Sequence, residues 1–526
     1  MPASPKLFAL LLGLLLSFES KAHSIWPIPR QITLSKDLQI LRATVKTNSS
    51  SKRLLKCIER YNFGGESVGS GGSYSTIEVN VESDDESLSQ STDTSFSVDA
   101  NGTTVTISSS TPYGACYGLD VLSQLVSTSD EDGSLFLPSS ISIQDSPSSN
   151  HRGFMIDTGR RFVPLDVIKS NIDAMFMSRL NVLHLHFADW CRYAIESKAF
   201  PALTADLVDD QAGHYTLDDI AEMISYANDR GIRVVPEVDI PGHGTWGLPL
   251  METGDLKYCT SSYPFSILDD GDNVSVATLK TLISEVAEIF GDEELFHIGA
   301  DETVANDDEG CTLDNIKGIE AKMFSHIIDN NKTPVGWEEV LYKSGGAKGF
   351  EGEAVINAWN AGPRPSNITS DGFDAIESMS ANFYLNNKPS WSDVWFDIGN
   401  EGVGGGDDEN VPQLRGGEVS MWTDNYCYVL QCGSVNDYDT KPVGAALYPP
   451  SMDKEFAASF QGMVWPKAAI AGGAFWNFVE LEEEELVERI QKFTTRLGEE
   501  GIDACPNGCD CDELTRCGES YIKVLF

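Results

Sequence analysis

The chain has little positive charge for its length. Its 526 residues contain 37 Lys and Arg against 80 Asp and Glu, which gives a formal net charge of −43 with histidine neutral. A protein of this charge cannot present the basic face on which nucleic-acid binding depends. We therefore exclude nucleic acid as a partner. The acidity otherwise indicates a solvated surface suited to acidic or salty surroundings.

The apolar run near the start of the chain is too short to cross a membrane. Leu7–Leu16 follows Lys6 and precedes Ser20–Ala22, which places small residues where a signal peptidase cuts. A spanning helix needs about 20 apolar residues, so we interpret residues 1–22 as a cleaved signal peptide and expect no membrane span. We then expect a secreted or lysosomal/vacuolar protein. Five N-x-S/T sequons agree with this route: Asn48, Asn101, Asn273, Asn331 and Asn367.

The chain has 11 cysteines, which in an oxidising compartment predict disulfides and one thiol left over. We predict Cys191 as the unpaired thiol. A zinc site in the carboxy-terminal cysteine set is the alternative, but that set lacks histidine. Spacing favours these local pairs: Cys57 with Cys116, Cys259 with Cys311, Cys427 with Cys432, and two bridges among Cys505, Cys509, Cys511 and Cys517.

After the leader, three regions differ in pattern. Residues 23–150 contain short alternating strand-like runs, which predict a small amino-terminal α/β domain. Residues 151–500 repeat strand, turn and helix, and 501–526 form a cysteine-rich extension. Eight strands alternating with helices predict a catalytic (β/α)8 TIM barrel in the α/β class. The strands are Gly153–Asp157, Asn181–Phe187, Ile232–Val238, Leu295–Gly299, Thr333–Trp337, Ala354–Trp359, Phe373–Ile376 with continuation to Tyr384, and Glu418–Trp422.

Carboxylates and indoles follow the predicted strands, where the active sites of such barrels lie. Sugars present apolar C–H faces ringed by hydroxyls, so indoles that stack and carboxylates that accept hydroxyl protons suit them. The pattern predicts a carbohydrate site that needs neither metal nor cofactor. The candidates are Asp157, Asp189, Asp239, His243, Asp301, Glu302, Trp337, Trp359, Tyr384, Trp422 and Asp424.

The adjacent carboxylates Asp301 and Glu302 are the most specific feature. If burial and its neighbour raise the pKa of one of them, the pair combines a proton donor with a permanent anion. Because neighbours in an extended segment point to opposite sides, we expect the two to approach a sugar from different directions.

The segment His297-Ile-Gly-Ala-Asp-Glu302 resembles the signature of the β-N-acetylhexosaminidases, family 20 of the glycoside hydrolases. The resemblance covers about residues 25–500. It implies an exo-acting enzyme that removes terminal β-linked N-acetylglucosamine or N-acetylgalactosamine from glycans or chitooligosaccharides, and it is compatible with a homodimer. Other segments follow in family order: Trp26-Pro27, His151–Arg161, Asn181–Asp189, Val238–His243, Gly336-Trp337, Phe383–Asn386 and Gly416–Trp422.

The resemblance also implies roles for individual residues. Glu302 is the general acid that later acts as base. Asp301 orients the 2-acetamido group and stabilises its developing charge in a retaining mechanism, because the acetamido oxygen itself attacks C1. The other implied roles are Tyr384 on the acetamido oxygen, Trp337, Trp359 and Trp422 as pocket walls, Arg152 on the 3- and 4-hydroxyls, Asp189 and His243 as a relay toward Glu302, and Asn386 and Asp424 as further substrate-binding residues.

Three positions depart from the family pattern. Ala300 stands where the family usually has Gly, and a methyl group is tolerated there if φ is negative. Trp190–Tyr193 replaces the usual sequence after Asp189, which alters that side of the rim. Asp424 replaces a Glu that binds the hydroxyls at C4 and C6. Because its carboxylate is one methylene shorter, we expect poor discrimination between gluco and galacto substrates.

Two other functions are compatible with parts of the sequence. His184-x-His186 with His243 and Asp424 imitates the metal site of an amidohydrolase, although it leaves the Asp301-Glu302 pair unexplained. Otherwise we expect the strand histidines to be hydrogen-bonded core residues. A non-catalytic sugar-binding barrel is the second alternative, but it would be expected to lose the acid, and Glu302 is present.

Overall fold

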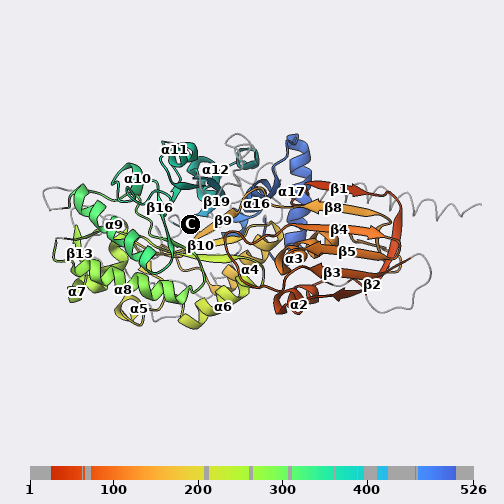
Figure 1. Cartoon of the computed structure of the whole chain (residues 1–526), viewed down its shortest axis with the longest axis horizontal. Coiled ribbons are helices and arrows are strands. Elements are labelled where there is room, and N and C mark those ends of the chain that lie inside the picture. Colours follow the sequence, from red (N-terminus) through yellow and green to blue (C-terminus); the bar gives the residue numbers. More distant parts are fainter. Residues whose placement is uncertain are drawn as a thin grey trace, which may run out of the picture.

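A computed structural model gives the fold of residues 25–504. It does not describe 62, 65–72, 206–212, 260–264, 270, 306–310, 361, 388, 396–411, 424–456 and 458–459. The predictions for the leader, the carboxy-terminal extension, Asp424, Cys427 and Cys432 therefore lie outside the described residues. A broad sheet with its helices lies beside a barrel (Figure 1).

An eight-stranded mixed sheet forms the amino-terminal region, in the order β1-β8-β4-β5-β3-β2-β7-β6. Helices α2 (Lys52–Glu59) and α3 (Pro112–Leu125) accompany it. Burial alternates along β5, because successive side chains point to opposite faces and α3 covers one of them. The strands are β1 (Gln31–Leu34), β2 (Leu38–Thr47), β3 (Ser73–Val81), β4 (Phe96–Asn101), β5 (Thr104–Ser109), β6 (Ser127–Thr128), β7 (Leu135–Pro138) and β8 (Ile141–Asp145).

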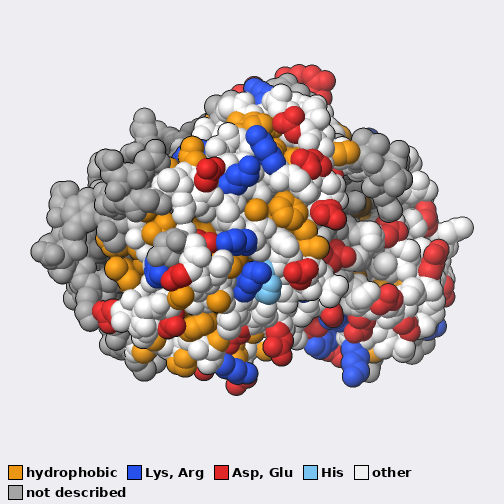
Figure 2. Space-filling model, turned by 60° about the vertical axis from the view of Figure 1, so that its left-hand side comes forward, with side chains coloured by type: hydrophobic (Ala, Val, Ile, Leu, Met, Phe, Trp, Pro, Cys, Tyr) orange, Lys and Arg blue, Asp and Glu red, His pale blue; other side chains and the backbone are white. Residues whose placement is uncertain are grey.

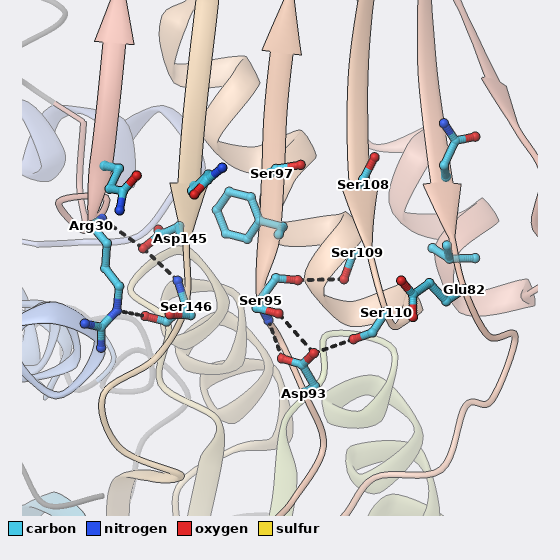
Figure 3. Close-up of a pocket in the computed structure, with 15 residues that line it drawn as sticks. Arg30, Glu82, Asp93, Ser95, Ser97, Ser108, Ser109, Ser110, Asp145 and Ser146 are labelled. Atoms are coloured by element: carbon cyan, nitrogen blue, oxygen red, sulfur yellow. Dashed lines mark hydrogen bonds between the residues drawn. The ribbon is translucent and has the colours of Figure 1, made fainter.

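A polar hollow of about 730 Å³ lies where β3, β4, β5 and β8 reach one end of this sheet (Figure 3). The carboxylate of Asp93 accepts hydrogen bonds from the hydroxyls of Ser95 and Ser110 at 3.0 and 2.5 Å. Asp145 accepts one from the Arg30 backbone N–H at 3.1 Å. These side chains satisfy one another, and the hollow is separate from the barrel rim.

Eight parallel strands close into a barrel, because β9 pairs with both β10 and β19. This confirms the predicted fold. Two expectations were wrong in detail: β15 ends at His297, and helix α12 (Ser380–Phe383) interrupts the chain between β18 and Tyr384. The strands are β9 (His151–Asp157), β10 (Val182–Asp189), β12 (Arg233–Val238), β15 (Leu295–His297), β16 (Thr333–Trp337), β17 (Val355–Ala358), β18 (Asp374–Glu377) and β19 (Leu414–Met421).

Helices surround the barrel (Figure 1). Helix α6 begins at the predicted capping box, in which Thr216 and Asp219 bond each other's backbone N–H groups. It ends just before Gly231, whose φ of 74° suits glycine at a helix end. The main helices are α4 (Leu165–Met177), α6 (Leu217–Asn228), α8 (Val274–Ile289), α9 (Leu313–Asp329), α10 (Glu339–Tyr342), α11 (Pro365–Ser370), α16 (Lys467–Asn477) and α17 (Glu483–Glu499).

The barrel interior is layered. An apolar layer comprises Val182, Val235, Leu295, Val335, Val355 and Ile376. Because inward-facing positions recur every two residues, the next layer contains His184, Glu237, His297, Trp337, Asn357 and Ser378, all buried. The interior therefore becomes polar and aromatic toward the carboxyl ends of the strands.

Two predicted disulfides are confirmed, Cys57–Cys116 and Cys259–Cys311. The prediction for Cys191 was wrong, because this cysteine is itself disulfide-bonded. Local spacing could not find its bridge, since the other described cysteines already pair with one another.

Buried polar contacts join the sheet region to the barrel. Asp120 of α3 forms an ion pair with Arg179 at 2.8 Å. The Trp476 indole donates to Asp145 at 3.0 Å, and that of Trp26 to the Ala469 carbonyl at 3.1 Å. The two regions therefore share one buried interface.

Acidic side chains are spread over the face in Figure 2, with Lys and Arg among them. Within the part of the chain that the structure describes, we find no helix with the length and apolarity needed to span a bilayer.

Candidate active site

His243 connects the carboxylates that follow two neighbouring strands. Its Nε2 lies 3.3 Å from a carboxylate oxygen of Glu302, in the loop after β15. Its Nδ1 lies 2.7 Å from Asp239, directly after β12, but 4.0 Å from Asp189. Asp239 is therefore the carboxylate that is hydrogen-bonded to the imidazole, and Asp189, the expected relay partner of His243, lies farther away at an ion-pair distance. Asp239 had no role assigned from the sequence, although it stands four residues before His243.

The two adjacent carboxylates differ in environment. The Asp301 side chain is 10% exposed and that of Glu302 is 59% exposed. Burial, with repulsion from Asp239, raises the pKa of Asp301 well above its usual value. The hydrogen bond from His243 lowers the pKa of Glu302. A single proton on this pair is therefore favoured on Asp301.

The loop that carries the pair is tightly curved. Gly299, Ala300 and Glu302 have φ values of 68°, 71° and 48°, so the segment is not extended as expected. The condition of a negative φ at Ala300 is not met, and a non-glycine residue in this region costs about 1–2 kcal/mol. His297 supports the turn, because its Nδ1 accepts the Gly299 N–H at 2.9 Å. The turn, rather than strand alternation, separates the two carboxylates.

Four aromatic side chains gather beside the pair. The Trp359 and Tyr384 rings stack with centroids 5.9 Å apart and planes 7° apart. Trp422 lies 5.7 Å from Tyr384 and 5.9 Å from Trp337. The predicted wall residues therefore form one cluster. Asn386 follows Tyr384 by two residues, and its buried Oδ1 has no hydrogen-bond partner among the residues described.

An arginine reaches this cluster, but it is not the predicted one. Arg160, after β9, pairs with Asp157 at 3.2 Å and Asp189 at 3.0 Å, and its guanidinium lies 4.9 Å from the Trp422 ring centre. Burial opposes ionisation of Asp189, but Arg160 and the neighbouring imidazoles lower its pKa to about 2. Asp157 also accepts the Thr423 N–H at 3.0 Å, which fixes the residue next to Trp422.

Arg152 lies at the other end of β9. It is 1% exposed and donates to the carbonyls of Arg179 and Ser149, both at 2.6 Å. Its guanidinium also packs over Trp476, 5.1 Å from the ring centre. The assignment of Arg152 to substrate hydroxyls was therefore wrong, because its side chain is committed to the interface with the sheet region.

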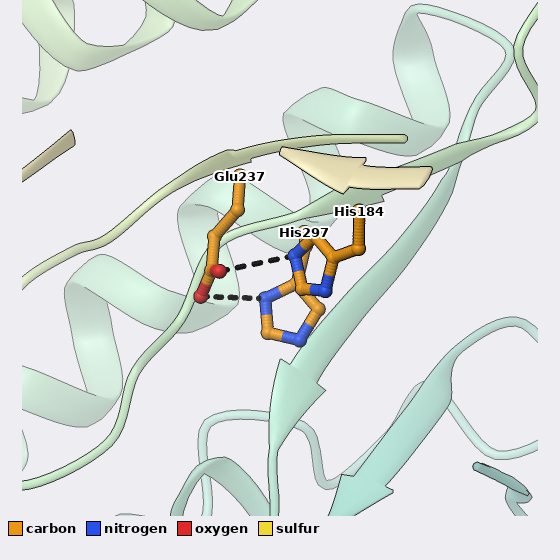
Figure 4. Close-up of side chains that lie close together, drawn as sticks. All are labelled: His184, Glu237 and His297. Atoms are coloured by element: carbon orange, nitrogen blue, oxygen red, sulfur yellow. Dashed lines mark ion pairs between the residues drawn. The ribbon is translucent and has the colours of Figure 1, made fainter. Parts of the chain in front are cut away.

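Glu237 is central to the buried layer beneath the aromatic cluster. It lies 3.0 Å from His184 and 3.1 Å from His297 (Figure 4). Its carboxylate also accepts the Trp337 indole N–H at 3.0 Å and pairs with His186 at 2.5 Å. Glu237 thereby connects the pocket wall with the charged residues near Asp189.

These histidines are engaged with carboxylates. The His184 nitrogens lie 2.9 Å from Glu418 and 3.0 Å from Glu237. Burial opposes its charge, but these two carboxylates raise the pKa of His184 to about 9. A protonated imidazole has no lone pair to offer a metal. The contacts therefore favour the hydrogen-bonded core role over the amidohydrolase-like site.

Known proteins resemble this chain in both sequence and fold. A model of "Glycosyl hydrolase family 20, catalytic domain" matches residues 150–477. The chain is 26% identical over 568 residues to beta-hexosaminidase subunit A1 of Dictyostelium discoideum, covering 99% of this chain and 98% of that protein. It is 28% identical over 426 residues to human beta-hexosaminidase subunit beta, covering 75% and 68%.

Solved structures share the fold. The β-N-acetylhexosaminidase of Bacteroides fragilis superposes with a TM-score of 0.71 at 20% identity, covering 92% of this chain and 99% of that one. The chitobiase of Flavobacterium johnsoniae gives 0.69 at 21% identity, covering 92% and 73%.

The barrel, its carboxylate pair and these matches define a glycoside hydrolase. The family match spans more than half of the chain. The chain therefore belongs to glycosyl hydrolase family 20, which confirms the family that the sequence motifs predicted.

Proposed function

We propose that the protein is an exo-acting β-N-acetylhexosaminidase that removes terminal β-linked N-acetylglucosamine or N-acetylgalactosamine with retention of configuration. The observation that carries this proposal is the Asp301–Glu302 pair, with opposite pKa shifts, beside the aromatic cluster. Two adjacent carboxylates in different environments can take two different roles. The names of the relatives support the substrate class.

In the first step, the substrate's acetamido oxygen attacks C1. The bond from C1 to the leaving oxygen breaks, and that oxygen takes the proton of Glu302. Asp301, as an anion, holds the acetamido N–H and stabilises the positive charge of the oxazolinium ion. Water then attacks C1 and gives its proton to Glu302, and the bond between C1 and the acetamido oxygen breaks, which opens the oxazolinium ring.

Substrate binding must redistribute the proton of the free enzyme. An acetamido N–H donated to Asp301 favours the ionised form of that carboxylate. A sugar over Glu302 excludes water from a side chain that is 59% exposed in the free enzyme, and this desolvation favours its protonated form. Burial opposes the charge of His243, but three surrounding aspartates raise its pKa well above the usual value, which favours its protonated form. It can therefore support Glu302 after the proton has left.

We further propose which side chains hold the sugar. Tyr384 hydrogen-bonds the acetamido oxygen, with Trp359 stacked on it and Trp337 and Trp422 around it. Arg160 replaces Arg152 as the residue for the ring hydroxyls, because it lies at the rim beside Trp422. The remaining proposed contacts with the sugar are Asn386 and Asp424. Asp189 positions Arg160 through their ion pair.

The decisive experiment compares wild type with Glu302→Gln on two substrates, an activated aryl glycoside and an unactivated disaccharide. We expect kcat on the disaccharide to fall by roughly 10² to 10⁴, the range for general acid–base catalysis, with a smaller loss on the aryl glycoside. A thiazoline analogue of the intermediate should inhibit wild type strongly. Unchanged turnover of the disaccharide, or thiazoline binding no tighter than the parent sugar, would refute the assignment.

We also propose that the enzyme acts in a secretory compartment, outside the cell or in the lysosome or vacuole. The grounds are the leader-like residues 1–22 and the sequons. Two of the relatives are named as subunits, which supports an assembly of more than one chain, and a homodimer stays a proposal. Secreted protein with an amino terminus near residue 23 would support the first proposal.

A further inference from the structure

A second pair of adjacent carboxylates, Glu338 and Glu339, follows β16. Glu338 accepts the backbone N–H groups of Trp359 and Asn360 at 2.9 and 3.1 Å. Glu339 accepts the indole N–H of Trp359 at 3.0 Å. One residue therefore holds the backbone of Trp359, and the next holds its ring.

The ring that Glu339 holds is the one stacked on Tyr384, with the two planes 7° apart. A charge-assisted hydrogen bond is roughly twice as strong as a neutral one, and it fixes the rotation of the indole in its plane. Because Trp359 is only partly buried, packing alone leaves this rotation less restricted than in the buried Trp337. The orientation of Tyr384 against the acetamido group then depends in part on Glu339.

Glu339 also acts on the catalytic pair through its charge. Repulsion from Glu339 adds to the burial and the Asp239 charge that raise the pKa of Asp301. Burial, with repulsion from Glu302, raises the pKa of Glu339, while the Trp359 N–H and Lys343 act in the opposite sense. The groups that act on the charges of Asp301 and Glu339 are Asp239, His243, Glu302 and Lys343. Glu338 is adjacent and is repelled by Glu339, but it is not among the groups that act on Asp301.

We propose that Glu339 is a positioning residue of the active site, which fixes the indole of Trp359 beside Tyr384 and, as a third carboxylate near Asp301 and Glu302, keeps one proton on that pair. This inference rests on the proposed function, since the single proton matters because the mechanism needs one acid and one anion. Glu339 itself transfers no proton to the substrate.

The consequence for pH dependence has a definite sign. The active free enzyme carries one proton on the Asp301–Glu302 pair, and interacting groups titrate as a pair. On the acid side of the profile, kcat/KM rises as the pair loses the first of two protons, and the pKa of this step depends on Glu302 and His243. On the basic side, kcat/KM falls as the pair loses its second proton, and the pKa of this step depends on Asp301. Glu339 opposes this second ionisation, so removing its charge moves the base limb to lower pH.

The test measures kcat/KM against pH on an aryl β-N-acetylglucosaminide for wild type, Glu339→Gln and Glu338→Gln. We expect Glu339→Gln to lower the base limb by about 0.5–1 pH unit, consistent with the loss of one nearby like charge. The acid limb should move less, in the same direction, because Glu339 also repels Glu302. Glu338→Gln is the matched control: it alters the adjacent carboxylate that holds the same tryptophan. Both of its limbs should coincide with those of wild type. A base limb of Glu339→Gln that coincides with wild type would overturn the proposal.

A second measurement tests the hydrogen bond. Trp359→Phe keeps a ring but removes the donor, and Glu339→Ala removes the acceptor, which Gln would retain. The effects of these two substitutions on kcat/KM should therefore be coupled by about threefold or more. Effects that simply multiply in the double variant would overturn the positioning role. Melting temperatures establish that each variant is folded. If wild type cleaves no N-acetylhexosaminide, the proposed function fails as well, whereas an active wild type with an unshifted Glu339→Gln refutes this inference alone.

Discussion

The buried pairing of Glu418 with histidine should make a measurable contribution to stability. Glu418 is 1% exposed inside the barrel, 2.9 Å from His184 and 3.3 Å from His151. Burial opposes its charge, but these imidazoles lower the pKa of Glu418 from 4.5 to about 2. At about 1.4 kcal/mol per pKa unit, its ionised form contributes about 3 kcal/mol to folding.

The sign of the pH dependence follows from the direction of this shift. A carboxylate with a depressed pKa stabilises the fold above its unfolded pKa of 4.5, and this contribution disappears as pH falls toward 2. His184 has the opposite sense: its pKa is raised to about 9, so its contribution is complete below pH 6.5 and is lost toward pH 9. The interaction is therefore strongest between about pH 4.5 and 6.5.

Glu418→Gln tests this reasoning by thermal unfolding. With an unfolding entropy of about 2.1 cal/mol/K per residue, 3 kcal/mol corresponds to a drop of about 4 °C in Tm for a barrel of this size. The exposed Glu353 is the control, and Glu353→Gln should change Tm by less than about 1 °C. We expect the difference between Glu418→Gln and wild type at pH 5.5 to shrink steadily as pH approaches 2. An unchanged Tm at pH 5.5, or a difference independent of pH, would refute the pairing.

Three further predictions concern the rim. Arg160→Lys removes the guanidinium that bridges two aspartates, so kcat/KM should fall about tenfold to a hundredfold. Arg152→Lys should instead lower Tm and keep kcat/KM within about threefold. Kinetics and melting curves of both variants test this. Asp301→Asn should lower kcat about a hundredfold even with activated leaving groups, because the anion stabilises the oxazolinium charge; a loss confined to unactivated substrates would contradict it. Wild type should prefer the gluco or galacto substrate by less than about tenfold in kcat/KM, and Asp424→Glu should increase that ratio because its longer carboxylate reaches a hydroxyl without a bridging water; a larger preference in wild type would count against this account.

The fold was predictable because the local patterns agreed with the global arrangement. Each barrel strand contributes an apolar inward position, such as Val182 or Val335, and turn and helix signals separate the strands. The shape of the loop after β15 was not predictable, because the sign of φ at Ala300 depends on how the chain must turn between His297 and Asp301. Glycine is the favoured residue at a positive φ, but such a φ does not require it.

The sequence also did not show which aspartate is hydrogen-bonded to His243. Asp189 ends β10 and Asp239 follows β12, and each comes one residue after the paired residues Ala188 and Val238, so the register places the two aspartates at the same height. His243 lies in the loop that follows β12, and this loop brings its Nδ1 within 2.7 Å of Asp239, four residues earlier. Asp189 faces Arg160 instead. Gly242 lies against the Asp301 backbone, so the path of the His243 loop depends on its packing against the loop after β15, which the spacing of Asp239 and His243 in the sequence does not show.

The structure places Arg160 at the rim, where the sequence had predicted Arg152, for a geometric reason that applies to any parallel barrel. The two arginines are eight residues apart, and β9 runs between them from its amino to its carboxyl end. At about 3.3 Å per residue, the strand from Arg152 to Asp157 spans about 16 Å. A motif that brackets a whole strand therefore places its first residue at the bottom of the barrel and its last at the rim, where the chemistry of this fold lies. In His151–Arg161, Arg160 follows Asp157 at the rim, and Arg152 precedes Gly153 at the interface with the amino-terminal sheet.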